Sequence, residues 1–273
     1  MIPGAGLGTL GFGSKSEFRR VDWISMKSSE TRKQRPESQL IRAELRSVSD
    51  PGKEKVLARF FKTGPGEYGY GDRFLGVVVP KIRKVVKSHR QARDEEVLKL
   101  LRSPYHEERL TALLILVEQY RRADASRKKS IYKLYLANTP LINNWDLVDL
   151  SAHAIVGDQL FGKDTSELTR LALSKNLWER RIAMLSTYHF IRRGESREAL
   201  RIAGILLHDT HDLIHKAVGW MLREVGKRCS REEECRFLDK HAAAMPRTML
   251  RYATEHFPEE LKRGYMQRRA NAD

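Results

Sequence analysis

The stretch RIAMLS at residues 181–186 has four counterparts along the chain, and their regular spacing indicates a repeated structure. The counterparts are RLTALL (109–114), WDLVDL (145–150), KAVGWM (216–221) and RYATEH (251–256). Their first residues are 36, 36, 35 and 35 positions apart. This period fits two helices with their turns, and one such pair cannot bury its apolar side alone. The sequence therefore predicts a stack of helix pairs.

The rest of the chain is consistent with helices throughout. Helical periodicity begins near Gln39, and no convincing alternating strand follows Val79-Pro80. We expect an all-α fold, a right-handed solenoid of HEAT-like helix pairs with a concave basic cleft. The expected organisation is a disordered extension over residues 1–36, a single solenoid domain over 37–265 and a polar tail over 266–273.

Charge indicates the kind of partner. The chain has 273 residues, with 51 Lys and Arg against 35 Asp and Glu, a formal net charge of +16. A basic protein of this kind favours a polyanion, nucleic acid before an anionic membrane surface. At 41% apolar residues it is neither a disordered chain nor a membrane protein. Two cysteines, Cys229 and Cys235, favour a reducing compartment, and we expect a cytoplasmic monomer, nucleoid-associated if bacterial.

Four repeat segments begin with a cation: Arg109, Arg181, Lys216 and Arg251. Equivalent positions of a regular solenoid line one stripe of its surface, so these cations are candidates for following a phosphate backbone. The alternative is that they are solvated helix formers.

The remaining repeat begins with Trp145, and Asp149 follows four residues later on the same helix face. An aromatic plane beside a carboxylate suits a cationic or sugar-like ligand. The carboxylate can also stabilise positive charge during cleavage of a glycosidic bond. The alternative is a half-buried Trp beside a solvated or salt-bridged Asp. Trp220 follows Gly219, and a glycine inside a helix indicates close approach of another backbone or a ligand.

Other motifs give weaker signals. The segment KTGPGEYGYGDRFLG (62–76) has five glycines but no P-loop Gly-Lys-Ser/Thr, so we expect a loop between helices. In HDTHDLIH (208–215), His211 and His215 have a metal-ligand spacing but no remote partners. Asp209 or Thr210 as a helix N-cap is the simpler expectation. We expect no metal and no cofactor.

Five strings together resemble the AlkD-type DNA alkylation repair glycosylases, whose members are HEAT-like solenoids. The strings run in order from about Leu40 to Phe257: FFKTGPGEYGYGDRFLGVVVPKIRK, NNWDLVDLSA, NLWERRIAML, IHKAVGWMLRE and MPRTMLRYATEHFP.

The resemblance implies a monofunctional glycosylase that removes N3-methyladenine and N7-methylguanine from double-stranded DNA. It implies an abasic product and no need for base flipping. Trp145, Asp149 and Trp220 would be catalytic, and Arg181 and Arg223 would hold the DNA backbone. The alternative is a non-catalytic HEAT-repeat module that binds structured or damaged nucleic acid.

Overall fold

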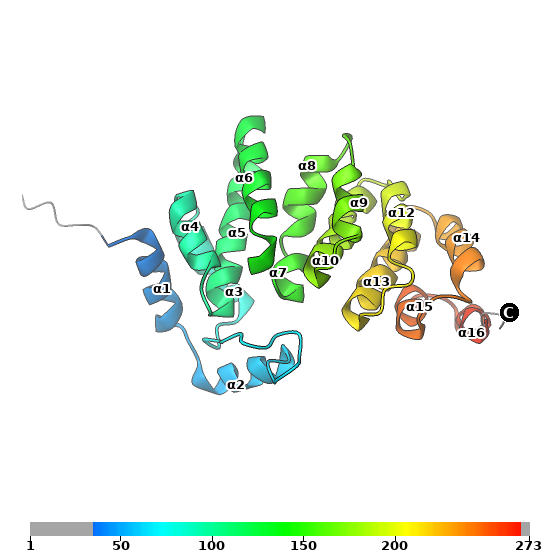
Figure 1. Cartoon of the computed structure of the whole chain (residues 1–273), viewed down its shortest axis with the longest axis horizontal. Coiled ribbons are helices and arrows are strands. Elements are labelled where there is room, and N and C mark those ends of the chain that lie inside the picture. The colour runs from blue at the N-terminus through cyan, green and yellow to red at the C-terminus, as the bar shows by residue number, and fades with distance from the viewer. Residues whose placement is uncertain (1–34, 269–273) are drawn as a thin grey trace, which may run out of the picture. The chain divides into compact units, whose positions relative to one another are not determined.

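A computed structural model describes residues 35–268, and those from Pro36 onward belong to one compact unit. The extension expected over 1–36 lies almost entirely outside the described residues, as does most of the expected polar tail. The described part consists of helices and connecting turns, with one isolated β-bridge between Arg73 and Tyr105 and no strand (Figure 1). The prediction of an all-α fold is confirmed.

The helices fall into short elements of one to five turns. The bounds of the first half are α1 (Glu37–Ser47), α2 (Pro51–Phe60), α3 (Val79–Ser88), α4 (Asp94–Leu101), α5 (His106–Arg122), α6 (Ala125–Ala137), the 3-10 turn η1 (Thr139–Leu141), α7 (Trp145–Asp149) and the π-helix η2 (His153–Gly157). Those of the second half are α8 (Asp158–Leu160), α9 (Ser166–Ala172), α10 (Leu177–Ser186), α11 (Tyr188–Ile191), α12 (Arg197–Ile205), α13 (Asp212–Arg228), α14 (Arg231–His241), α15 (Arg247–Ala253) and α16 (Glu259–Gln267).

The five repeated segments lie in α5, α7, α10, α13 and α15, and each of these helices contacts the next in that order. A second series packs against them, with α4 on α5, α9 on α10, α12 on α13 and α14 on α13. Figure 1 shows the described helices following one another side by side. This neighbour-to-neighbour packing is the helical solenoid that the period predicted.

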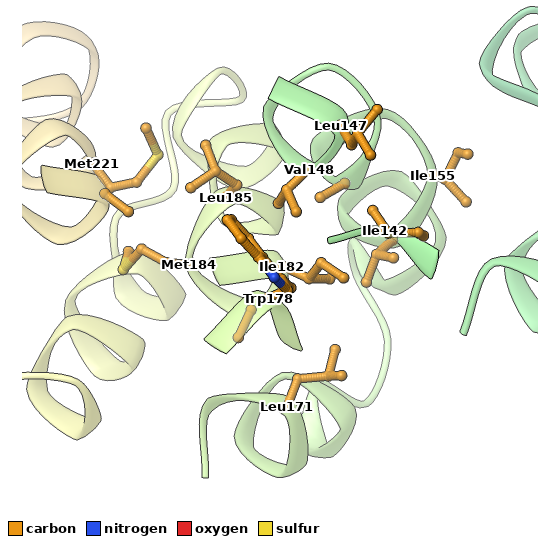
Figure 2. Packing of buried hydrophobic residues seen from close by; sticks show 14 of the residues in the cluster. Ile142, Leu147, Val148, Ile155, Leu171, Trp178, Ile182, Met184, Leu185 and Met221 are labelled. Carbon is orange, nitrogen blue, oxygen red and sulfur yellow. The ribbon is translucent and has the colours of Figure 1, made fainter. Parts of the chain in front are cut away.

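The core is continuous through successive helices. Figure 2 shows Leu147 and Val148 of α7 beside Ile182 and Leu185 of α10, with Met221 of α13 on the far side. All five side chains are buried. A stack of this kind removes apolar surface from water at every helix contact, which contributes about 25 cal/mol for each Å² buried.

Gly219 allows α15 to pack closely against α13. A Cβ at this position would lie 2.4 Å from the carbonyl oxygen of Met249 and 2.5 Å from the Cβ of Tyr252 on α15. The expected close approach of another backbone is confirmed, because only glycine leaves room for α15 against α13.

No helix in the described part is long and apolar enough to cross a membrane.

Gly219→Ala should destabilise the protein by about 1–3 kcal/mol, because α15 must move to admit the methyl group. The matched control is Gly204→Ala in α12, where a Cβ meets nothing within 4 Å and better helix propensity adds up to about 1 kcal/mol. Urea unfolding measures both. Equal effects of the two substitutions would contradict the packing described for α13 and α15.

Candidate active site

The short helix α7 presents Trp145 and Asp149 together. The Asn144 side chain accepts a hydrogen bond from the backbone N–H of Trp145 at the start of the helix. Leu147 and Val148 are fully buried beneath it. Trp145 and Asp149 line one hollow of about 470 Å³, named here the Trp145 pocket. The i,i+4 spacing therefore places both side chains at one cavity, as expected.

Side chains from an earlier part of the chain hold the Trp145 ring in place. Its ring stacks on Phe61 at a centroid distance of 5.1 Å and meets Phe60 edge-on at 5.8 Å. Its indole Nε1 donates a hydrogen bond to the Tyr68 hydroxyl at 3.2 Å. These contacts fix the ring plane, and they come from α2 and the glycine-rich loop. That loop is a connection between helices, as expected, and it carries Tyr68 to Trp145.

Asp149 is held from the other side by Arg181 of α10. The guanidinium donates from Nε and Nη2 to the two carboxylate oxygens, both at 2.8 Å, and from Nη1 to the carbonyl of Leu213 at 2.6 Å. Burial raises the pKa of Asp149, and the charge of Arg181 opposes that rise. The two hydrogen bonds from Arg181 fix the orientation of the Asp149 carboxyl group at the edge of the Trp145 pocket.

Trp220 lies on α13 and does not line the Trp145 pocket. It is half-buried, with its ring 6.1 Å from that of Tyr188. Arg181 connects the two places, because it binds Asp149 of α7 and the Leu213 carbonyl at the start of α13. The structure thus brings Trp145 and Asp149 together and puts Trp220 on a helix tied to them.

A buried network of charged side chains contacts α7, and it was not predicted from the sequence. His106 Nε2 lies 2.8 Å from Asp146 Oδ2, and its Nδ1 lies 3.4 Å from Asp72. Arg109 donates to the other oxygen of Asp72 at 2.7 Å. The His106 ring also lies 4.8 Å from both Phe61 and Phe74. No local motif signals this network, because its members come from positions 34 to 40 residues apart.

The charges in this network support one another. Burial lowers the pKa of His106, but the Asp146 carboxylate, with help from Asp72, outweighs burial and raises it to about 9. Burial alone would raise the pKa of Asp72, yet hydrogen bonding to His106 and the charge of Arg109 lower it. His106 is therefore a buried cation at neutral pH, and it anchors Asp146 and hence α7.

Next to the Trp145 pocket runs a groove lined with cations, named here the basic groove. It joins two hollows of about 350 and 230 Å³ that share Arg121 and His153, and Leu150 lines both the groove and the Trp145 pocket. Burial lowers the pKa of His153 to about 4, so this ring is uncharged. The Lys and Arg residues of the groove, set against Glu118 and Asp158, are Arg83, Lys87, Arg90, Arg121, Arg122, Arg192 and Arg193.

Comparison with known proteins agrees with the fold and identifies the family. The model of the family described as "DNA alkylation repair enzyme" matches residues 41–257. The chain belongs to the DNA alkylation repair enzyme family. A solved structure described as "Predicted DNA alkylation repair enzyme from Enterococcus faecalis" has a TM-score of 0.59 at 14% identity, over 77% of this chain and 97% of that chain. That likeness shows the shared fold. No curated protein sequence matches this one significantly.

The repeat-equivalent cations of the chain do not form one exposed row. Arg109 and Arg181 are buried in ion pairs with Asp72 and Asp149. Lys216 is half-buried and pairs with Asp212 at 2.7 Å, whereas Arg251 is exposed. The expectation of a uniform stripe is corrected, because two of its members are used as internal partners of carboxylates.

Arg223 and the histidine segment also have internal contacts. Arg223 is largely buried and forms an ion pair with Glu255. His211, rather than Asp209 or Thr210, caps α13, its side chain accepting from the backbone N–H of Leu213, while Asp209 accepts from the N–H of His211. Within residues 35–268, no group of three or more His, Cys, Asp or Glu side chains has the arrangement of a metal site.

His106→Gln should lower stability most at low pH. The folded pKa of about 9 exceeds the ordinary histidine pKa of 6.5, so protonated His106 contributes on the order of 3 kcal/mol below pH 6.5, and this contribution fades as the pH rises through 9. Urea unfolding of wild type and variant between pH 6 and pH 9.5 measures the difference. A gap in unfolding free energy that stays constant over this range would show that His106 is not a buried cation.

Proposed function

We propose that the protein is a monofunctional DNA glycosylase that hydrolyses the N-glycosidic bond of cationic alkylated purines in duplex DNA. N3-methyladenine and N7-methylguanine are the proposed lesions, and an abasic site with a free base is the proposed product. The observation that carries this proposal is the Trp145 pocket, where an indole ring and the oriented carboxylate of Asp149 line the same space. Family membership supports DNA repair as the setting.

The proposed reaction needs little acid catalysis from the protein. The bond between C1′ of the sugar and the base breaks, and its electron pair neutralises the cationic base, which leaves without a proton. Positive charge then develops on the deoxyribose, as in glycoside hydrolysis. Water adds to C1′ and releases a proton. Because the leaving group is already activated, one carboxylate suffices where ordinary glycosidases use two.

Asp149 would stabilise that developing charge and orient the water. Its bidentate contact with Arg181 fixes both carboxylate oxygens before substrate arrives, which is the preorganisation that makes electrostatic stabilisation effective. The face of Trp145 would pack against the sugar, and we assign Trp220 of α13 the same task. These contacts reach only the sugar, so they are compatible with the mode without base flipping that the resemblance implies.

The basic groove is the proposed path of the DNA backbone. Its cations lie beside the Trp145 pocket and outnumber its two carboxylates. We include Arg251, Lys216 and Arg223 as further backbone contacts, whereas Arg181 and Arg109 would act through the carboxylates that they hold. Together these surfaces would form the concave basic cleft of a right-handed solenoid, working in the cytoplasm on double-stranded DNA without metal or cofactor.

A second candidate is a non-catalytic module that binds structured or damaged nucleic acid. The basic groove favours it, since phosphate binding alone accounts for such a surface. The two candidates differ in one outcome: only the glycosylase releases a base.

Asp149→Asn should reduce release of 7-methylguanine from methylated duplex DNA by at least about 100-fold, the loss typical of removing one electrostatic contact to a transition state. Chromatography of the released base measures this directly. Asp164→Asn, at a fully exposed carboxylate, is the control and should match wild type. Folding of the Asp149 variant is checked by circular dichroism. Full activity in that variant would remove Asp149 from the mechanism, and no release by wild type would favour the non-catalytic module.

Replacing Arg121 and Arg192 together by Ser should flatten the salt dependence of DNA binding. Each phosphate contact contributes about 0.9 to the slope of log K against log salt concentration. The matched control is Arg197→Ser, whose side chain is 90% exposed on α12 outside the basic groove. Fluorescence anisotropy between 50 and 200 mM salt gives the slopes. If the double variant keeps the wild-type slope, the DNA backbone does not follow the basic groove.

A further inference from the structure

Three aromatic side chains, named here the aromatic row, connect the backbone of Asp149 to Trp220. His153 follows Asp149 by four residues, and its Nδ1 lies 3.2 Å from the Asp149 carbonyl oxygen. The His153 ring meets the ring of Tyr188 edge-on at a centroid distance of 5.7 Å. Tyr188 lies 6.1 Å from Trp220. Since Trp220 does not line the Trp145 pocket, the row provides an aromatic path between the two places.

The rings of the aromatic row come from three successive parts of the solenoid. His153 begins η2, Tyr188 begins α11, and Trp220 lies within α13. All three residues are half-buried, so each keeps part of its surface accessible to a ligand. The row therefore adds open aromatic surface next to the candidate catalytic residues and outside the Trp145 pocket.

His153 belongs to the aromatic row as a fixed neighbour and not as a charge. Its Nδ1 donates to the Asp149 carbonyl oxygen, since a carbonyl oxygen can only accept. Burial lowers the pKa of His153 to about 4, so its other ring nitrogen carries no proton and cannot donate to a phosphate. The uncharged ring is suited to holding Tyr188 in place and unsuited to binding an anion.

Two cations lie close to Tyr188. The Arg228 guanidinium, which also pairs with Glu224, lies 5.6 Å from the centre of the Tyr188 ring. Arg192 follows Tyr188 by four residues, is exposed, and lines the hollow of about 230 Å³ together with His153. The face of an aromatic ring is electron-rich, and the C–H groups of a deoxyribose are slightly positive, so the two pack well together. The neighbouring cations suit the phosphates attached to such a sugar.

We propose that Tyr188 binds the deoxyribose of the nucleotide that adjoins the lesion on the same DNA strand. This inference rests on the proposed function, in which Trp145 and Trp220 pack against the sugar of the lesion itself. Successive nucleotides of one strand are about 3.4 Å apart along the helix axis and are also rotated about it. A ring centred 6.1 Å from that of Trp220 therefore suits the next sugar along the strand.

A second sugar contact holds the lesion strand at two points. With one sugar against the two tryptophans and its neighbour against Tyr188, the lesion sugar cannot turn relative to the Asp149 carboxylate. Such orientation is a large part of what an active site contributes to a rate. The contact involves no base, so it leaves the adjoining base in the helix and does not depend on the DNA sequence.

The test is a double-mutant cycle between Tyr188 and the adjoining sugar. Short DNA duplexes carry a tetrahydrofuran nucleotide, a stable analogue of the abasic product, at the lesion position. The adjoining position holds either a second tetrahydrofuran nucleotide or a propanediol linker, which keeps the phosphates but lacks the sugar ring. The adjoining position is placed on the 5′ side and on the 3′ side in turn. Fluorescence anisotropy gives the affinities of the wild-type protein and of Tyr188→Leu for each duplex.

The wild-type protein should bind the propanediol duplex about fivefold more weakly on one side only, the effect of losing roughly 40 Å² of apolar contact. Tyr188→Leu should lose most of this difference because leucine has no flat face, whereas Tyr188→Phe should keep it because the ring remains. The matched control is Tyr132→Leu, which should also keep the difference. Tyr132 is half-buried like Tyr188, but it lies on α6 and lines neither the basic groove nor the Trp145 pocket.

Equal affinity of the wild type for both duplexes on either side, equal weakening on both sides, or an undiminished difference in Tyr188→Leu would overturn the proposal. Loss of the difference in Tyr188→Phe would assign the contact to the hydroxyl group and would overturn it as well. Release of 7-methylguanine from methylated duplex DNA by the wild type is measured in parallel. Release without coupling between Tyr188 and the sugar would refute the sugar site and retain the glycosylase. Coupling without release would retain the sugar site and refute the glycosylase.

Discussion

The ion pair between Asp149 and Arg181 ties three successive helices of the solenoid into one site. Asp149 ends α7, Arg181 belongs to α10, and the third nitrogen of the guanidinium binds the Leu213 carbonyl at the start of α13. Removing one partner of such a buried pair leaves an uncompensated charge and typically costs about 3–5 kcal/mol. The carboxylate of Asp149, to which we assign the chemistry, thus also helps to hold α7, α10 and α13 together.

Buried charges also support α7 through the network around His106. His106, charged by its contacts with Asp146 and Asp72, packs against Phe61 and Phe74, and Phe61 in turn stacks on Trp145. An electrostatic network and an aromatic stack therefore meet at α7, the helix that carries Trp145 and Asp149. Binding sites need such support, because a side chain placed about 1 Å wrongly loses much of its effect.

The period of 35–36 residues was enough to predict the solenoid, because every repeat must bury its apolar face against the next. The pairing of Trp145 with Asp149 was also predictable, since helix geometry relates positions i and i+4. The roles of Arg109 and Arg181 were not, because a cation at a helix start looks alike in sequence whether it is exposed or paired. Contacts of Asp72 and Tyr68 depend on the path of the glycine-rich loop, which no local pattern specifies.

In the proposed mechanism, a carboxylate held by Arg181 stabilises charge on the sugar as an already cationic base departs. The most direct test compares two duplexes of identical sequence, one with 7-methylguanine and one with hypoxanthine, an uncharged purine lesion. Single-turnover kinetics of base release by the wild-type protein give the two rates. We expect release of 7-methylguanine and none of hypoxanthine above background, whereas comparable rates for both lesions would contradict the proposed mechanism.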